Sequence, residues 1–129
     1  MSRTLKRLNG ISLSVIVLAL LKQEDSYGQE LYIKIKKIIQ GEIKWSNASV
    51  YPILKGLEKE RMIRSFWKIE DKVRPRKYYS ILDKGNAQLE ARKEEADFLE
   101  AEFRRILNPY IIYPIDDENL ESYIDTDRG

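Results

Sequence analysis

Cysteine and histidine are both absent from this 129-residue sequence. Their absence excludes disulfides, zinc sites of the Cys/His type, cysteine nucleophiles and every catalytic triad that contains histidine. Long hydrophobic runs are missing as well, because the apolar stretch 15–21 is far too short to cross a bilayer. With no membrane span and no signal peptide, the sequence predicts a cytoplasmic protein without a membrane partner.

The features of an enzyme are scarce. The six glycines form no phosphate-binding loop, and no recognisable pair of catalytic carboxylates stands out. We therefore expect no cofactor, no metal and no enzymatic activity. The acidic run 116–118 is of the kind that is usually solvated rather than metal-binding.

The charge is unevenly distributed along the chain. The formal net charge is only +2, but residues 108–129 hold six acidic residues and one basic residue. Residues 1–107 therefore hold 22 basic and 15 acidic residues, a net charge of +7. A basic body with an acidic tail favours a polyanionic partner such as nucleic acid, although a merely soluble charged surface explains the charge equally well.

The first half of the chain predicts two helices. One runs from Asn9 or Gly10 to Lys22 and is apolar nearly all round, so it should be buried on all sides. In so short a chain we expect a second subunit to cover one side; the alternative is a central core helix in a monomer. The second helix is expected to start at Ser26, because Ser26 and Gln29 have the spacing of a capping box.

A third helix should follow Ser46 or Asn47, which suit its N-cap. Val50 and Leu57 belong to its apolar face, whereas the opposite face is small near its start and basic further on. Small residues let a helix end approach base edges, and lysines such as Lys55 can then meet phosphates. The alternative is an ordinary surface helix that carries lysines.

The segments 63–69 and 77–82 are rich in β-branched and aromatic residues, so they predict a β-hairpin. Its loop is basic and is stiffened by Pro75. Cations at such a tip can contact the DNA backbone or enter the minor groove, although they can also protect an exposed sheet edge. The cations in question are Lys68, Lys72, Arg74, Arg76 and Lys77.

A long fourth helix is predicted over 84–107, ended by Asn108 and Pro109. Its apolar residues repeat at heptad spacing, with Arg92 as one polar position in the seam. We expect this seam to pair with a second copy of the chain in a homodimer; the alternative is that the helix folds back on its own domain. The expected dimerisation residues are Leu89, Ala96, Leu99, Phe103 and Ile106.

These predictions combine into one architecture. The fold class is mainly α with a small β-hairpin: a winged helix-turn-helix with a long C-terminal dimerisation helix. The expected parts are a DNA-binding domain over 1–83, a dimerisation helix over 84–107, and a tail over 108–129. In the tail, the apolar segment 110–115 should dock on the body or on the partner subunit, because an exposed segment of this kind would favour aggregation.

Over roughly 9–107 the chain resembles the PadR family of bacterial winged-helix transcriptional regulators. The resemblance implies a dimer that binds operator DNA, usually as a repressor, with the last helix as the dimerisation arm. For some members it also implies a small hydrophobic or phenolic effector in or near the dimer interface. The matching segments are the apolar helix after Gly10, Tyr27-Gly28 with Glu30-Leu31, Ser49-Val50-Tyr51-Pro52 with Leu54 and Leu57-Glu58, Arg76-Lys77-Tyr78-Tyr79, and Leu82-Asp83-Lys84-Gly85.

The sequence departs from the family pattern at three places. Gln29 stands where an aromatic residue is usual, and Arg61 with Met62 replaces the glycine that commonly ends the recognition helix. The last helix lacks the tryptophan with which drug-responsive members stack their ligand, and Phe98 and Phe103 are its nearest substitutes.

The leading hypothesis is a homodimeric regulator, a repressor of transcription, whose partner is double-stranded DNA. The alternative is a winged-helix protein-interaction module, because fold alone does not decide function. The expected DNA-contacting residues are Asn47, Ser49, Tyr51, Lys55, Lys72, Arg74, Arg76 and Lys77.

Overall fold

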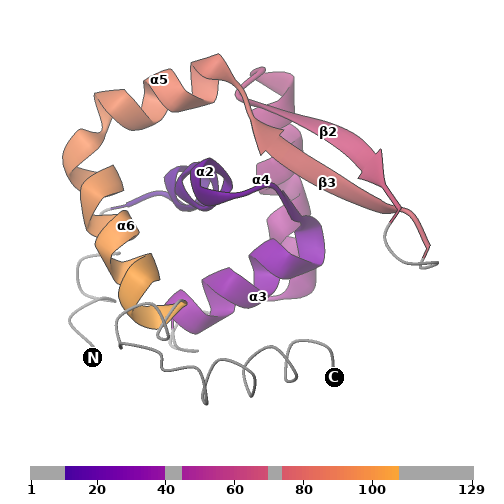
Figure 1. Ribbon diagram of the computed structural model, residues 1–129, viewed down its shortest axis with the longest axis horizontal. Coiled ribbons are helices and arrows are strands. Elements are labelled where there is room, and N and C mark those ends of the chain that lie inside the picture. The colour runs from indigo at the N-terminus through magenta and orange to yellow at the C-terminus, as the bar shows by residue number, and fades with distance from the viewer. Residues whose placement is uncertain (1–10, 40–44, 70–73, 108–129) are drawn as a thin grey trace, which may run out of the picture.

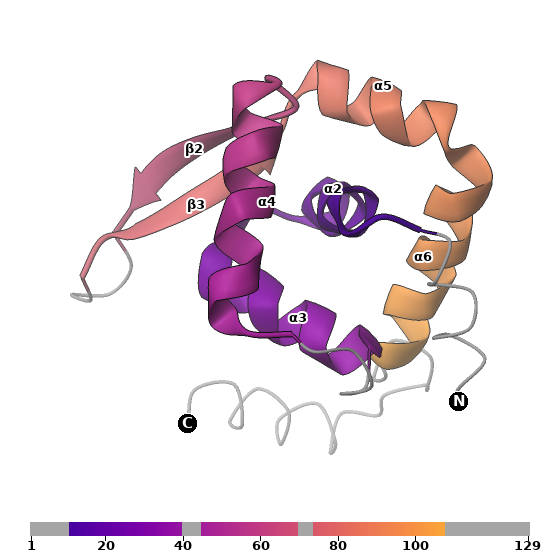
Figure 2. The ribbon, with the colours of Figure 1, turned by 180° about the vertical axis from the view of Figure 1, so that it is seen from behind.

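Helix α2 forms the centre of the fold in the computed structural model, which describes residues 11–39, 45–69 and 74–107. Figures 1 and 2 show it end-on, surrounded by α3, α4, α5 and α6. In chain order the elements are α2 (Leu13–Gln23), β1 (Ser26–Tyr27), α3 (Gly28–Ile39), α4 (Asn47–Lys59), β2 (Ile63–Lys68), β3 (Arg76–Ile81), α5 (Asp83–Ala91) and α6 (Lys93–Ile106).

The apolar helix α2 is buried on all sides, as its composition predicts. Ser12 caps its start by accepting a hydrogen bond from the Val15 backbone N–H, at 3.3 Å. Every residue from Val15 to Leu21 is buried. The cover comes from the same chain, because α2 contacts α3, α4, α5, α6 and β3. The expectation that a second subunit covers one side of this helix is therefore wrong. The alternative holds: α2 is a central core helix of the single chain.

The start of α3 differs from the prediction. Ser26 does not cap the helix; Ser26 and Tyr27 form the short strand β1, and the helix begins at Gly28. The Ser26 side chain is fully buried, and its hydroxyl accepts a hydrogen bond from Lys34 Nζ at 3.4 Å. Ser26 lies in a strand rather than at the helix cap because β1 pairs with β3, with Ser26 opposite Tyr79 and Tyr27 opposite Tyr78.

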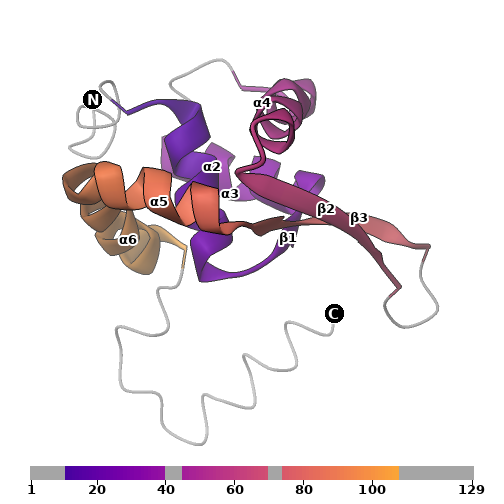
Figure 3. The same ribbon diagram turned by 90° about the horizontal axis from the view of Figure 1, so that it is seen from above.

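The predicted hairpin is confirmed, and β1 extends it to a three-stranded antiparallel sheet of order β1-β3-β2. We call residues 63–69 and 74–81 the wing. Its outer part projects away from the helices (Figures 1 and 3). The inner part joins the core through Ile63 and Tyr79, which are both buried.

The end of α4 sets the direction in which the wing leaves the body. The backbone N–H of Met62 donates to the Leu57 carbonyl at 2.9 Å, and that of Arg61 donates to the Glu58 carbonyl at 3.0 Å. This pair of bonds is the Schellman motif, in which the residue after the cap is left-handed. Arg61 has φ 61°, so an arginine occupies the position that glycine usually takes.

The predicted single helix over 84–107 is wrong. It is broken at Arg92, whose φ of −118° and ψ of 42° are not helical, and the chain turns from α5 into α6. After the break α6 contacts α2 and α3 of its own chain (Figure 2). Leu99 and Phe103 are 0% exposed in the resulting core.

The expected dimerisation seam therefore faces inward in the single chain. Leu89 is buried with Leu99 and Phe103, while Ala96 and Ile106 are half-buried. The alternative that the last helix folds back on its own domain is the arrangement found. Among the described residues, no helix is long and apolar enough to cross a membrane. The expectations about the tail 108–129 lie outside the described residues.

Replacing either of two glycines by alanine should change the free energy of unfolding, in opposite directions at the two positions. At Gly85, a Cβ would lie 2.4 Å from the Met62 carbonyl oxygen and 2.7 Å from Ile81 Cγ1. We expect Gly85→Ala to lower the free energy of unfolding by about 1–3 kcal/mol, because backbone and core must move to make room. At Gly56, within α4, nothing lies within 4 Å of an added Cβ, so Gly56→Ala should raise it by about 1 kcal/mol through helix propensity.

Urea denaturation of both variants beside the parent protein measures these changes. Equal stabilities for the two variants would contradict the packing described around Gly85.

Candidate nucleic-acid interface

The start of α4 is fixed by two serines. The backbone N–H of Ser46 donates to Ser49 Oγ at 3.2 Å, and the two hydroxyl oxygens are 3.1 Å apart. These contacts are those of a capping box, in which the side chain three residues into the helix satisfies the backbone of the cap. The Ser49 hydroxyl, expected to contact DNA, is thus used within the protein, where it fixes the leading end of the helix.

Asn47 stands exposed at the first position of α4. Its Nδ2 donates a hydrogen bond to Gln29 Oε1 at 3.4 Å, so the leading ends of α3 and α4 present two amide side chains together. Gln29 was not predicted as a functional residue. Its departure from the family's usual aromatic residue is the signal that could have identified it.

Tyr51, at the start of α4, contacts Gly28, at the start of α3. A Cβ added to Gly28 would lie 3.1 Å from Tyr51 Cε1, so the ring lies against the start of α3 and would have to shift slightly to admit a larger residue there. The side chain is still 50% exposed. Tyr51 therefore has a supported ring and an accessible surface at the outer face of α4, which is the arrangement required of a contact residue.

Half-buried polar groups join α4 to the sheet. The Ser65 hydroxyl donates a hydrogen bond to Glu58 Oε2 at 2.7 Å. Burial raises the pKa of Tyr79 above its ordinary value of 10.0, and the nearby Glu58 carboxylate and Tyr51 raise it further. Tyr79 therefore remains neutral at physiological pH, so its contact with α4 does not gain a negative charge.

The outer surface of α4 is exposed and basic. Pro52, Lys55 and Lys59 are all exposed along it, and the first turn contains no acidic residue. The N-terminus of a helix carries a partial positive charge, which adds to that of the lysines. This surface is suited to a polyanion.

The wing carries cations that lie over aromatic rings. Such cation–π contacts hold a charged group in place while leaving it open to a phosphate. The pairs, with the distance to the ring centre, are Arg76 over Tyr27 (4.5 Å), Lys68 over Tyr78 (4.9 Å), Arg64 over Phe66 (5.0 Å) and Lys77 over Tyr79 (5.9 Å).

The predicted wing residues are divided between two faces. Arg76 pairs with Lys68 in the β2–β3 register, whereas Lys77 pairs with Trp67. Neighbouring residues of a strand point to opposite faces, so Arg76 and Lys77 lie on opposite sides of the ribbon. Arg74 is exposed at the outer end, and Lys72 lies outside the described residues. Arg64 and Trp67 are further exposed wing residues, which the sequence pattern does not single out.

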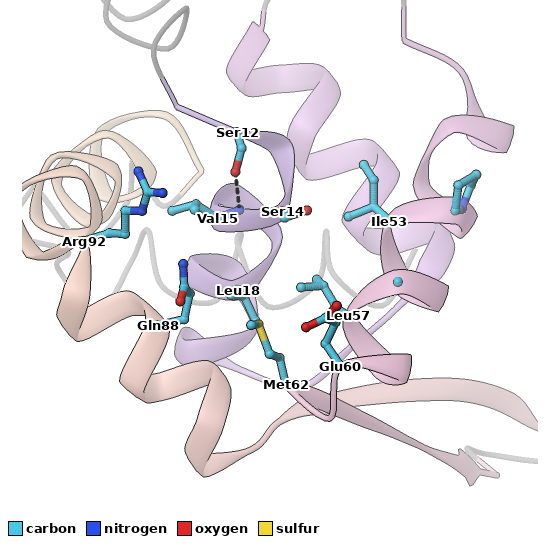
Figure 4. Close-up of a pocket in the computed structure, with 12 residues that line it drawn as sticks. Ser12, Ser14, Val15, Leu18, Ile53, Leu57, Glu60, Met62, Gln88 and Arg92 are labelled. Carbon is cyan, nitrogen blue, oxygen red and sulfur yellow. Dashed lines mark hydrogen bonds between the residues drawn. The ribbon is translucent and has the colours of Figure 1, made fainter.

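A pocket of about 540 Å³ lies behind α4, between α2, α4 and α5. Figure 4 shows Val15, Leu18 and Leu57 toward its centre, with Gln88 and Arg92 on the side formed by α5 and the break that follows it. The pocket is mainly apolar and has a polar end. A small molecule bound there would contact the inner side of the helix that carries the basic surface.

The arrangement is that of the winged helix-turn-helix class: three packed helices, the last with an exposed outer face, are followed by a basic β-hairpin. Comparison with known proteins gives the family. The model of the transcriptional regulator PadR-like family matches residues 17–91. This chain belongs to the PadR-like family of transcriptional regulators.

Solved structures of similar fold include a member of this family. A PadR-like transcriptional regulator from Bacillus cereus is 34% identical, with a TM-score of 0.60 over 78% of this chain and 94% of the other. The circadian clock associated protein Pex from Anabaena is 27% identical, with a TM-score of 0.52 over 77% of this chain and 76% of the other.

Bacillus subtilis PadR, solved in complex with operator DNA, shares the fold. It is 20% identical, with a TM-score of 0.53 over 91% of this chain and 60% of the other. Among curated proteins, no sequence matches this chain.

The capping role of Ser49 predicts a loss of stability when the hydroxyl is removed. Ser49→Ala should lower the free energy of unfolding by about 1 kcal/mol, and Ser49→Thr, which keeps a hydroxyl, should lower it less. Thermal or urea denaturation checks both. A Ser49→Ala variant of unchanged stability that binds DNA more weakly would instead show a direct contact.

Proposed function

We propose that this chain is a sequence-specific DNA-binding repressor that acts as a homodimer in the cytoplasm. One observation carries the proposal: the exposed, basic surface of α4 lies beside a wing whose cations are held in place on aromatic rings. The operator complex of the distant Bacillus subtilis relative supports the same mode of action.

In this proposal α4 enters the major groove, which is wide enough for an α-helix. Asn47 and Tyr51 lead, because they are exposed at the starting end of the helix. The amide of Asn47 can bond a base edge, and the Tyr51 hydroxyl can bond a phosphate. Lys55 follows on the same exposed surface and contacts the backbone, while Ser49 acts by holding the end of the helix.

The wing contacts the backbone on either side of the groove. Arg74, Arg76 and Lys77 supply the charge, and Lys72 belongs to the same predicted set. Because Arg76 and Lys77 occupy opposite faces of the ribbon, a wing inserted between two phosphate strands can contact both.

The salt dependence of binding tests the role of the wing. Each phosphate contact releases counterions, so Arg74→Ala and Arg76→Ala should each weaken binding to every sequence and flatten the log–log salt slope by about one unit. Lys22→Ala, at the exposed C-terminal end of α2 and outside both the proposed DNA surface and the dimerisation arm, is the control and should leave the slope unchanged. Unchanged slopes for both arginine variants would remove the wing from the interface.

Two copies are required to read a two-fold symmetric operator, with half-sites about one helical turn apart. The arm in this proposal is 84–107, between the DNA-binding part over 1–83 and the tail over 108–129. Because Leu99 and Phe103 of α6 lie in the chain's own core, dimerisation through them requires α6 to leave the body at the Arg92 break and pack on the other copy. Leu89 lies on α5, before the break.

Sedimentation equilibrium should give twice the chain mass of 15.2 kDa at micromolar concentration. A mass of 15.2 kDa throughout, in the presence and absence of DNA, would contradict the homodimer.

A small hydrophobic or phenolic effector, implied by the family resemblance for some members, has a suitable place in the apolar pocket behind α4. A ligand there would contact Ile53 and Leu57 on the inner face of α4 and could shift its outer face. Such a ligand changes the DNA affinity only if it binds more tightly to one of two conformations, the one with α4 in its present position or one with α4 shifted.

The second candidate function is a protein-interaction module. The observation that favours it is the exposed apolar surface at the end of the wing, because such surfaces often mark protein contacts. Binding to the DNA upstream of the chain's own coding sequence, compared with a random duplex over a salt series, separates the two. Tight, salt-sensitive preference for the upstream DNA supports the repressor, and no binding to either duplex at low salt supports the interaction module.

A further inference from the structure

The outer end of the wing carries two apolar side chains that the core does not use. Trp67 is 68% exposed and Ile69 is 71% exposed, which makes them the most exposed large hydrophobic residues in the part of the chain that the structure describes. Two residues apart, they have the spacing at which side chains of an extended chain share a face. Such exposure without a partner is unfavourable, so a binding partner is expected to cover it.

The register identifies the face on which Trp67 lies. In the antiparallel β2–β3 pair, Trp67 is opposite Lys77 and Ser65 is opposite Tyr79. These four residues share one face, because side chains two apart and directly opposite lie on the same side of a sheet. Ser65 donates its hydroxyl hydrogen bond to Glu58 of α4, so this face is the one turned toward the recognition helix.

A ligand that contacts the outer surface of α4 therefore meets the Trp67 face when it extends along the wing. If that ligand is DNA, a wing beside a helix in the major groove reaches the neighbouring minor groove.

The charges around this apolar pair distinguish DNA from a protein partner. Lys77 stands directly across from Trp67, Arg76 and Lys68 occupy the next pair toward the tip, and Arg74 is exposed beyond them. Lys77 shares the face of Trp67, whereas Arg76 and Lys68 lie on the opposite face of the ribbon. An apolar pair with cations beside it and behind it matches the minor groove, where phosphates on both sides flank the stacked bases. Proteins that insert apolar side chains there unstack a base step and bend the duplex.

We propose that Trp67 and Ile69 form an apolar wedge that enters the minor groove beside the half-site, where Trp67 contacts a base step and bends the DNA. This inference rests on the proposed function and adds to it a specific role for the wing. The wedge should favour DNA that has a pyrimidine–purine step at the point of insertion, because such steps are the most easily kinked.

The first test uses tryptophan fluorescence. The chain contains two tryptophans, Trp45 and Trp67. Trp45 is half-buried, stacks on Tyr32 and donates its Nε1–H to the Tyr32 carbonyl at 3.1 Å. Trp45→Phe keeps the ring stacking and leaves Trp67 as the single reporter. Adding the upstream DNA should quench the emission of this variant, with a midpoint equal to its binding midpoint. An unchanged emission at saturating DNA would overturn the wedge.

The second test separates apolar from charged contacts. Trp67→Ala should lower DNA affinity about tenfold, because an aromatic contact with a base is lost. Its salt slope should stay that of the parent, unlike the slopes of Arg74→Ala and Arg76→Ala, because no phosphate contact is removed. The fluorescence energy transfer between dyes at the two DNA ends should fall, since a less bent duplex is longer end to end.

Matched variants complete the design. Ile69→Ala should act in the same direction as Trp67→Ala, and Ile33→Ala on α3, an isoleucine that is 42% exposed, should leave affinity and bending unchanged. Trp67→Phe should restore most of the affinity. Parent-like affinity and bending of Trp67→Ala would overturn the wedge and leave the repressor intact, whereas a parent protein that binds no DNA would overturn both.

Discussion

Burial of α2 is the interaction on which the rest of this structure depends. Seven consecutive residues of that helix are removed from water, and each fully buried Val, Leu or Ile side chain contributes about 1.5–3 kcal/mol relative to exposure. Four other helices pack around it, so their positions are set by a shared core rather than by their own propensities. Helix α4 contributes Val50, Leu54 and Leu57 to that core, which leaves its opposite surface exposed.

The wing extends that arrangement outward. The Schellman motif at Arg61 turns the chain from α4 into β2, and the Ser65–Glu58 hydrogen bond ties the two elements together. Tyr51 lies against Gly28 at the other end of α4, where α4 contacts α3. The surface that we assign to DNA is therefore assembled from separate motifs whose relative positions follow from these few contacts and from the shared core.

Much of this arrangement is predictable from sequence, because it follows from strong local periodicity. The apolar helix is confirmed, but it starts at Leu13 with Ser12 as its cap rather than at Asn9 or Gly10. Of the two predicted caps of α4, Ser46 or Asn47, the structure uses Ser46, and the hairpin is confirmed. Other features depend on distant residues. The strand β1 has two residues and no period of its own, and it forms because Tyr78 and Tyr79 of β3 lie beside it.

The break at Arg92 is likewise unmarked in the sequence. Its neighbours Ala91 and Lys93 are good helix formers, and the turn follows from the burial of Leu99 and Phe103 against α2 and α3. The local pattern shows that these side chains are apolar, but it does not show which surface they cover. The same limit applies to Trp67, whose exposure depends on how far the wing projects beyond the core.

The central claim, that α4 and the wing of two copies read operator DNA, is tested most directly by hydroxyl-radical footprinting on the DNA upstream of the chain's own coding sequence. The account predicts two protected half-sites whose centres are about one helical turn apart, with protection extending into the flanking minor grooves. Uniform cleavage at low salt and saturating protein would contradict it.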